Sequence, residues 1–217
     1  TLYGDDGADV LSGGENDDLL VGGAGSDWMS GGAGSDTLNG GNDRDLTNGG
    51  AGSDLIELDG TETYANGFVA FNVSSGSQIG TQARVNLEGL VRIETVIDGG
   101  ADADIVQLSE ESDAFFLHDA FSGFHDAVDL TEDSIGNESA ARFTNIEEIR
   151  GMGGDDIIDL TSPDYSLAGE YLSVDGGDGD DIIWGSDADE YIYGGDGDDV
   201  IFGGIGFDVL LGGFGAD

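Results

Sequence analysis

The sequence lacks cysteine and lysine, and its 217 residues include a single proline, Pro163. Without cysteine the chain can form no disulfide framework and cannot bind zinc through thiolates. Five arginines stand against 47 aspartate and glutamate residues, which gives a net charge of −42. This excess of negative charge excludes binding to nucleic acid through neutralised phosphates. No stretch approaches the roughly 20 apolar residues of a membrane-spanning helix, and no secretory signal peptide opens the sequence.

A net charge this large is typical of disordered chains, but two features favour a folded protein. Apolar residues make up 38% of the sequence, and the acidic residues recur at fixed intervals. Residues 4–57 are six tandem copies of nine residues, in which glycine dominates positions one, two and four. The sixth position is always aspartate, and the eighth is apolar in every copy except at Thr47. The copies begin at Gly4, Gly13, Gly22, Gly31, Gly40 and Gly49.

The first five positions of each copy predict a tight turn. Glycine adopts positive φ without steric cost, and Asn16 and Asp43, which replace it at position four, belong to the residue types that tolerate positive φ best. Positions seven to nine are expected to be extended, with position eight facing one way and its neighbours the other. Three residues are too short for a stable strand, so the pieces must stack on other copies. Two copies then form one coil of a flattened solenoid whose interior is filled by position eight.

The row of aspartates predicts a bound cation. Stacked coils would place equivalent carboxylates roughly 4.8 Å apart, and at an effective dielectric of about 20 each pair repels by roughly 3.5 kcal/mol. Oxygen ligands in flexible loops suit Ca²⁺ better than Mg²⁺, which demands near-ideal octahedral geometry. An EF-hand loop starting at Asp178 fails because Ile182 stands where a ligand is needed, and no phosphate-binding glycine loop has the required context.

The nine-residue copies resemble the RTX repeat GGxGxDxUx, a calcium-binding β-helix repeat. The resemblance implies an all-β fold, a right-handed parallel β-roll interrupted here by longer β-rich coils. Each calcium ion would lie between loops two copies apart. It would be held by carbonyls of positions one and three of one loop and two and four of the other, with position-six carboxylates bridging. About seven to ten ions are expected.

The metal-binding residues that the resemblance implies are Gly4, Asp6, Asp9, Gly13, Glu15, Asp18, Gly23, Gly25, Asp27, Gly32, Gly34, Asp36, Gly41, Asp43, Asp45, Gly50, Gly52, Asp54, Asp104, Asp156, Gly176, Asp178, Asp181, Gly195, Gly197, Asp199, Gly204, Gly206, Asp208 and Asp217.

The repeat divides the chain into three parts. We predict an N-terminal β-roll block at residues 1–57, β-rich insertions at 58–175 and a C-terminal block at 176–217. The insertions contain two isolated repeat-like loops, at residues 99–107 and 151–159. Partial copies at both ends, Thr1–Tyr3 and Asp217, favour a fragment of a longer protein.

Alternating apolar and polar residues predict strands in the insertions. The expected strands are Thr63–Val73, Gln82–Ile97, Phe115–Leu117, Ala127–Leu130 and Arg142–Ile149, with turns at Gly76–Ser77 and Glu88–Gly89. Because Ile93–Ile97 and Ile146–Ile149 precede the two isolated loops alike, we interpret the insertions as the duplication of one wide coil.

Two features single out the C-terminal block. Its loop Gly185–Glu190 departs furthest from the repeat, with Ser186, Ala188 and Glu190 at positions two, four and six, so we expect the weakest calcium site there. Its outward positions are apolar: Ile182, Trp184, Tyr191, Tyr193, Val200, Phe202, Val209 and Leu211. We expect Trp184 beside Phe202 and Ile182 beside Val200. The chain's own segments Tyr165–Leu172 or Phe115–Phe124 are the expected cover; a missing part of the parent protein or another subunit is the alternative.

No enzymatic activity is expected, because the sequence has neither a GxSxG nor an HExxH motif. His118 and His125 are open to two interpretations, a metal or general-base site and residues of turns or strand faces.

The resemblance implies a protein that leaves the cell unfolded by type I secretion and folds on binding calcium outside, or at the cell surface. The expected role is a rigid structural or adhesive module of an adhesin or surface protein, with neighbouring domains or further copies as partners. The calcium module of a secreted enzyme or toxin is the alternative, and a ligand-binding face on the insertions is a third.

Overall fold

The computed structural model describes residues 1–59, 63, 69–71, 84–93, 95–117, 142–162 and 166–217. Within these residues all regular structure is strand, which confirms the all-β class. They contain no helix of the length and apolar character needed to cross a membrane. The predicted turn at Gly76–Ser77, the predicted strand Ala127–Leu130 and both histidines, His118 and His125, lie outside the described residues.

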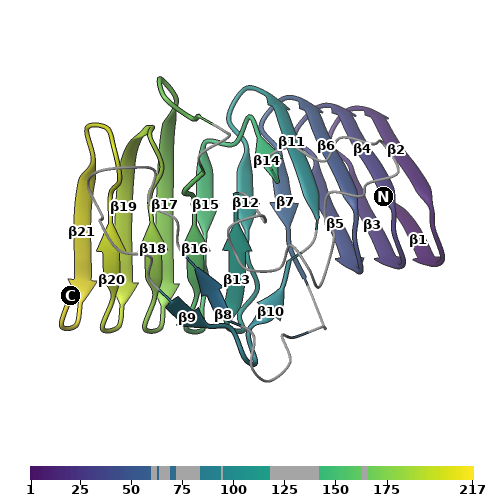
Figure 1. The fold of residues 1–217 in the computed structure, drawn as a ribbon. Coiled ribbons are helices and arrows are strands. Elements are labelled where there is room, and N and C mark those ends of the chain that lie inside the picture. Colours follow the sequence, from purple (N-terminus) through teal and green to yellow (C-terminus); the bar gives the residue numbers. More distant parts are fainter. Residues whose placement is uncertain (60–62, 64–68, 72–83, 94, 118–141, 163–165) are drawn as a thin grey trace.

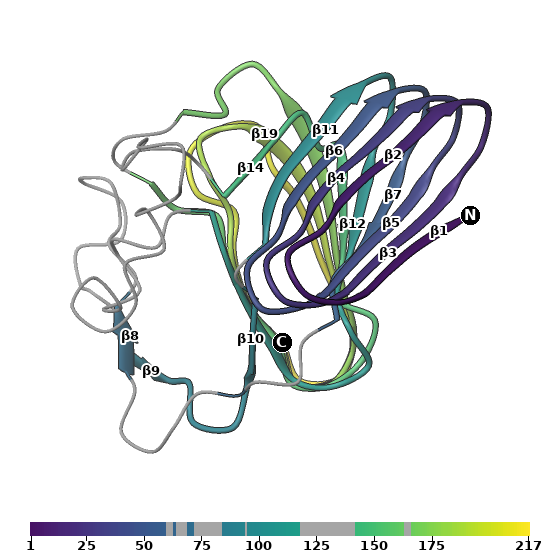
Figure 2. The same cartoon turned by 90° about the vertical axis from the view of Figure 1, so that its right-hand side faces the viewer.

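Three parallel sheets form a roll along which the chain advances from β1 to β21 (Figure 1). The long sheet contains, in order, β1 (Leu2–Asp6), β3 (Leu19–Ala24), β5 (Thr37–Asn42), β7 (Leu55–Glu57), β12 (Ile105–Gln107), β15 (Glu148–Arg150), β17 (Tyr171–Asp178), β19 (Asp189–Asp196) and β21 (Val209–Phe214). The N-terminal sheet contains β2 (Val10–Glu15), β4 (Trp28–Ala33), β6 (Leu46–Ala51), β11 (Val96–Ala101) and β14 (Phe143–Thr144). The C-terminal sheet contains β10 (Val91–Arg92), β13 (Asp113–Phe116), β16 (Ile157–Asp159), β18 (Ile182–Trp184) and β20 (Val200–Phe202). A short antiparallel pair, β8 (Val69–Phe71) and β9 (Arg84–Asn86), stands beside β10, away from the coils (Figure 2).

Two copies of the repeat make one coil, as the sequence predicts. Leu20 pairs with Leu2 on one side and with Leu38 on the other, each 18 residues away. The position-eight side chains Leu20, Met29 and Leu38 are fully buried between the sheets. The strands are longer than the three residues expected, because positions one to three of the next copy stay in register; Gly14 still pairs with Gly32.

The middle of the roll contains two wider coils, each with a strand in all three sheets. One consists of β7, β10 and β11, and the next of β12, β13 and β14, in matching register. The extra strand makes room for large side chains, and Phe115 stacks on Phe143 with ring centroids 5.6 Å apart. This wide core extends from Ile56 to Ile192, whereas the separate core of the first coils consists of Leu11, Leu20, Met29 and Leu38.

The wide coils do not correspond in the way that the sequence suggests. Ile97 pairs with Phe143, and Ile149 pairs with Val106, so Ile93–Ile97 and Ile146–Ile149 lie in different sheets and are not equivalent. The predicted strand Arg142–Ile149 is broken into β14 and β15 because Asn145 turns the chain with a φ of 55°.

The predicted strand Gln82–Ile97 is also broken, into β9, β10 and the start of β11. The turn predicted at Glu88–Gly89 separates β9 from β10, and Gly89 has a φ of 91° there. Its hydrogen bond runs from the Leu90 amide to the Leu87 carbonyl, at 3.1 Å. The two leucines therefore lie together at the turn.

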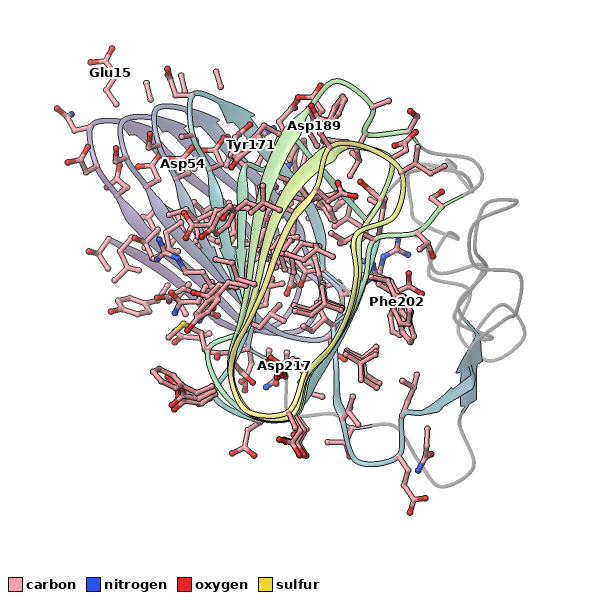
Figure 3. The ribbon with its side chains drawn as sticks, turned by 90° about the vertical axis from the view of Figure 1, so that its left-hand side faces the viewer. Glu15, Asp54, Tyr171, Asp189, Phe202 and Asp217 are labelled. Atoms are coloured by element: carbon pink, nitrogen blue, oxygen red, sulfur yellow. The ribbon has the colours of Figure 1, made fainter. Side chains whose placement is uncertain are left out.

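Part of the outer apolar face of the C-terminal sheet is covered by the chain itself. Trp184 stacks beside Phe202, with ring centroids 6.4 Å apart and planes 9° apart, as predicted. Trp184 is only 3% exposed and packs in a cluster with Leu87 and Leu90. Leu87 and Leu90 are a cover that the sequence analysis did not expect, whereas Phe116, in the expected segment Phe115–Phe124, belongs to the same cluster. The rest of that segment from residue 118 on, and Tyr165, lie outside the described residues. The cover ends before β20, where Phe202 is 38% exposed and points outward from the roll (Figure 3).

Replacing Phe115 by alanine tests the wide core. The side chain is fully buried and stacked on Phe143, so the substitution should lower the free energy of unfolding by about 3–5 kcal/mol. Phe207, which is 89% exposed, is the control, and its replacement by alanine should change stability by no more than about 0.5 kcal/mol. Chemical denaturation in saturating calcium measures both; equal effects of the two substitutions would contradict the assignment of the core.

Candidate metal centre

The position-six carboxylates form ladders along the edges of the roll. The backbone N–H of each aspartate donates a hydrogen bond to Oδ1 of the aspartate one coil further on. Asp9 N lies 2.8 Å from Asp27 Oδ1, and Asp27 N lies 2.9 Å from Asp45 Oδ1. On the opposite edge the same bond links Asp18, Asp36, Asp54 and Asp104 in turn, at 2.7–2.8 Å. A third ladder runs through Asp113, Asp156, Asp181, Asp199 and Asp217, at 2.7–3.2 Å.

The ladder bonds leave one oxygen of most carboxylates without a partner. Among the described residues, eleven such oxygens are buried and accept no hydrogen bond. They are Oδ2 of Asp9, Asp27, Asp36, Asp45, Asp54, Asp104, Asp156, Asp181 and Asp199, Oδ1 of Asp113 and Oε2 of Glu190. A buried charged oxygen without a partner is costly. Its repetition along the roll indicates a ligand that binds oxygen at each step.

The glycines at position one keep space open beside these oxygens. A Cβ atom on Gly22 would lie closer than 3.0 Å both to Asp27 Oδ2 and to the carbonyl oxygen of Gly40. The same collision recurs at Gly31, Gly49, Gly176 and Gly194 with the carboxylate of the same loop and the first carbonyl of the next loop. A carboxylate oxygen and a carbonyl oxygen thus converge on the same small space in successive coils.

Positions two and four take the left-handed backbone conformation that the turn needs. Asn16, Asp43 and Asp102, which replace glycine at position four, have φ values of 74°, 73° and 84°. The predicted ligand residues at these positions, Gly23, Gly25, Gly32, Gly34, Gly41, Gly50, Gly52, Gly195, Gly197, Gly204 and Gly206, all have positive φ.

Between two loops, the carbonyls of positions two and four belong to the earlier loop and those of positions one and three to the later loop, an order that the resemblance did not specify. The carbonyl oxygens of Asp5 and Gly7, at positions two and four of an earlier loop, point at the later loop. The first carbonyl of the later loop, Gly22, points back, and the third, Ala24, accepts a hydrogen bond from Gly7 N at 2.7 Å. Six predicted donors stand at positions one and three of their loops: Gly4, Asp6, Gly13, Glu15, Gly176 and Asp178. The carbonyls of these positions face the preceding loop and not the following one. The side chain of Glu15 points away from the roll (Figure 3), so only its backbone belongs to the loop.

The loops fit a calcium ion. All the converging atoms are carboxylate and carbonyl oxygens, which are the ligands of Ca²⁺. No three acidic or histidine side chains come together to form a metal site in the described part of the chain, and the converging backbone carbonyls offer an ion further oxygen ligands. Flexible coordination by six to eight oxygens permits this for Ca²⁺, whereas the strict octahedron of Mg²⁺ does not favour it.

Burial shifts the titration of the ladder in the absence of metal. It raises the pKa of Asp156 to about 9, with the charges of Asp113 and Asp181 adding to the effect. Burial likewise raises the pKa of Asp45 and of Asp181 to about 7. Each of these carboxyls therefore holds its proton more tightly in the metal-free fold than in the unfolded chain.

The loop Gly185–Glu190 is irregular, as its sequence suggests. Neither Ser186 nor Ala188 has a positive φ. The Ser186 backbone N–H donates to Glu190 Oε1 at 2.8 Å, and the Ser186 hydroxyl donates to the same oxygen. Burial raises the pKa of Glu190 to about 7, although these two bonds act against the rise. Asp208, the next carboxylate on this edge, accepts the Glu190 N–H at 3.3 Å, which is long for a ladder bond.

The structure adds two carboxylates to the ladders that the sequence analysis missed. They are Glu147, whose Oε2 accepts the N–H of Asp104 at 2.8 Å, and Asp113, whose N–H donates to Oδ1 of the predicted Asp156 at 2.7 Å. Both stand in loops without the glycine pattern. The signal in the sequence was the spacing, since each acidic residue stands two positions before a buried apolar residue, Phe115 or Ile149, as position six precedes position eight in a repeat.

Comparison with known proteins gives one match. The family model of the RTX calcium-binding nonapeptide repeat matches the chain four times, at residues 1–29, 21–56, 173–201 and 184–217. No curated protein and no solved structure matches it. The matches cover the regular ladders at both ends and stop where the wide coils begin.

The raised pKa values predict how the metal-free fold responds to pH. Because the folded-state pKa values of about 7–9 lie above the ordinary value of 3.8, protons stabilise the metal-free fold, and this stability is lost as the pH rises through that range. Circular dichroism of metal-depleted protein should therefore show more β-structure at pH 5 than at pH 9. In saturating calcium the signal should stay flat over the same window; more structure at pH 9 without metal would contradict the prediction.

Restoring the repeat at Gly185–Glu190 should strengthen its ion. The combined variant Ser186→Gly, Ala188→Gly and Glu190→Asp recreates the positions of regular loops such as Gly176–Asp181. Calorimetric titration should then show the weakest calcium site of the protein becoming tighter, while Ser53→Gly, an exposed change at position five, leaves the binding curve unchanged. Equal affinity at all the C-terminal sites of the unmodified protein would contradict this prediction.

Proposed function

The chain belongs to the RTX calcium-binding nonapeptide repeat family, and on this premise we propose that it is a rigid structural module of an extracellular adhesin or surface protein that folds when it binds calcium. In this proposal the module carries no catalytic step. Its role is to provide a rigid, extended segment outside the cell. Its partners would be neighbouring domains of a longer chain or further copies of the module.

The observation that carries the proposal is the row of buried carboxylate oxygens without partners. Position-six carboxylates such as Asp27, Asp36 and Asp54 are at most 3% exposed, and the five arginines are too few to neutralise 47 acidic residues. A fold that buries carboxylates in rows is unfavourable until cations neutralise them.

The energies are sufficient for calcium to decide between folded and unfolded chain. Extracellular calcium modules bind their ions with dissociation constants of about 10⁻⁴–10⁻³ M. At tenfold excess over that constant each ion adds about 1.4 kcal/mol. Some seven ions would add about 10 kcal/mol, which is of the order of a domain's whole stability. At submicromolar calcium the same sites contribute almost nothing, which would keep the chain unfolded inside a cell.

The continuous long sheet supports a role in rigid extension. Nine strands run from β1 to β21 through both matched blocks and the coils between them. Every pairing in it is parallel and in register with the next, from Leu2 with Leu20 to Ile192 with Leu210. The module would therefore behave as one rigid unit and not as separate domains joined by flexible linkers.

Circular dichroism and scattering test the proposal. In a chelator at pH 8 the far-ultraviolet spectrum should be mostly that of unfolded chain, and in millimolar calcium it should be that of β-structure, with a matching fall in the radius of gyration. Millimolar magnesium is the control and should leave most of the chain unfolded. A chain equally folded in chelator and calcium would refute calcium-dependent folding.

A further inference from the structure

The loop Leu108–Asp113 occupies the place of a repeat loop, although it contains no glycine. It stacks residue by residue on the regular loop Gly151–Asp156. Asp113 N donates to Asp156 Oδ1 at 2.7 Å, and Asp155 N donates to Ser112 Oγ at 2.8 Å. The sequence Leu-Ser-Glu-Glu-Ser-Asp therefore corresponds to positions one to six of a repeat, in a region that the family matches do not reach.

Asp113 has the same half-satisfied carboxylate as the regular ladder. It is fully buried; Oδ2 accepts the Ser109 backbone N–H and the Ser109 hydroxyl, both at 2.8 Å. Oδ1 is buried without any hydrogen bond. In a regular loop the first oxygen accepts an N–H from the preceding aspartate. Asp113 is the first member of its ladder, so Ser109 supplies the missing donors.

The same arrangement occurs at the start of another ladder. Ser186, also at position two, donates to the position-six carboxylate of Glu190 through its N–H and its hydroxyl. In both loops the serine Oγ accepts the N–H two residues on, from Glu111 at 3.1 Å and from Ala188 at 3.0 Å. The residue that precedes Glu190 in the long sheet is Leu172, which offers no carboxylate. A serine at position two thus replaces the preceding coil wherever a described ladder begins inside the roll.

The backbone of the Leu108–Asp113 loop also presents an oxygen to the next loop. A Cβ atom on Gly154 would lie closer than 3.0 Å to the Glu111 carbonyl oxygen, just as one on Gly25 would to the Gly7 carbonyl oxygen. Position four therefore faces the interloop space in this loop as in the regular ones. The facing loop has its usual shape, with φ values of 74° at Met152 and 101° at Gly154.

We propose that the loops Leu108–Asp113 and Gly151–Asp156 hold one further calcium ion between them, with the Asp113 carboxylate as a ligand and Ser109 as its positioning residue. The proposal rests on the proposed calcium-dependent function, but it concerns a loop without the repeat's glycines. It extends the row of ions into the wide coils.

Protonation of Asp113 would not complete its hydrogen bonding. Because Oδ2 accepts two hydrogen bonds, a proton would have to sit on Oδ1, where the structure offers no hydrogen-bond partner. A buried O–H donor left unpaired costs about 1–3 kcal/mol. A cation beside Oδ1 satisfies the same atom without that cost.

Counting bound ions tests the proposal. Native mass spectrometry in calcium acetate should show one ion fewer per chain for Asp113→Asn than for the unmodified protein. Glu170→Gln is the matched control, because it removes one exposed charge outside the repeat loops and should leave the count unchanged. Asp36→Asn, in a matched repeat, should also lose one ion and reports on the proposed function independently.

Two results would overturn the inference. If Asp113→Asn retains the full count while Asp36→Asn loses an ion, Asp113 is not a ligand and the calcium function stands. If the unmodified protein binds no calcium, the proposed function fails first.

If Asp113→Asn does not fold, Ser109→Ala decides. It should weaken one ion by about tenfold, as loss of a partner that orients a ligand does, with recovery in Ser109→Thr. An unchanged affinity of every ion in Ser109→Ala would refute the role of Ser109 and of the site.

Discussion

Repulsion between carboxylates buried in rows is the constraint on which the rest of this structure depends. The ladder hydrogen bond, from one aspartate N–H to the next Oδ1, fixes the position of each carboxylate but satisfies only half of it. The regular loops then need glycine at position one, since a Cβ there would fill the space beside Oδ2. It also needs positive φ at positions two and four, which turns the carbonyls toward the same space. The composition, the turn and the ion requirement are therefore consequences of one arrangement.

The two kinds of coil divide the stability unevenly along the roll. The first coils enclose a single row of position-eight side chains, and their separate core has only four members. The wide coils enclose Phe115, Leu117 and Phe143, and the Phe116–Trp184 cluster adds a second apolar layer outside the C-terminal sheet. Each buried large apolar side chain contributes roughly 1.5–3 kcal/mol. Apolar packing therefore stabilises the wide coils more than it stabilises the N-terminal coils. Those coils must rely on their ions.

Regular periodicity made much of this predictable. The period of nine gave the 18-residue coil, the inward face of position eight and the ladder of aspartates, and the preference of asparagine and aspartate for positive φ explained Asn16 and Asp43 correctly. What the sequence could not supply was the correspondence between coils that have lost the period. Asn145 and Glu147 complete a loop that is shorter than a repeat, so no fixed spacing reveals that Phe143 pairs with Ile97. The direction of the carbonyls and the role of Ser109 depend on backbone dihedral angles, which the pattern of residue types leaves open.

The ladder bond has a consequence for the way the roll is built, because it points one way. Each N–H reaches forward to the carboxylate of the coil that follows, from Asp9 to Asp27 in the first ladder and from Asp199 to Asp217 in the third. The donors of a coil are thus engaged only once its successor is in place, while its acceptors are filled by its predecessor. A row of such bonds has a direction, so its first and last coils present chemically different groups. Two ladders begin within the fold, where no aspartate of a preceding coil donates to the first carboxylate. In both, a serine at position two of the same loop donates to that carboxylate instead.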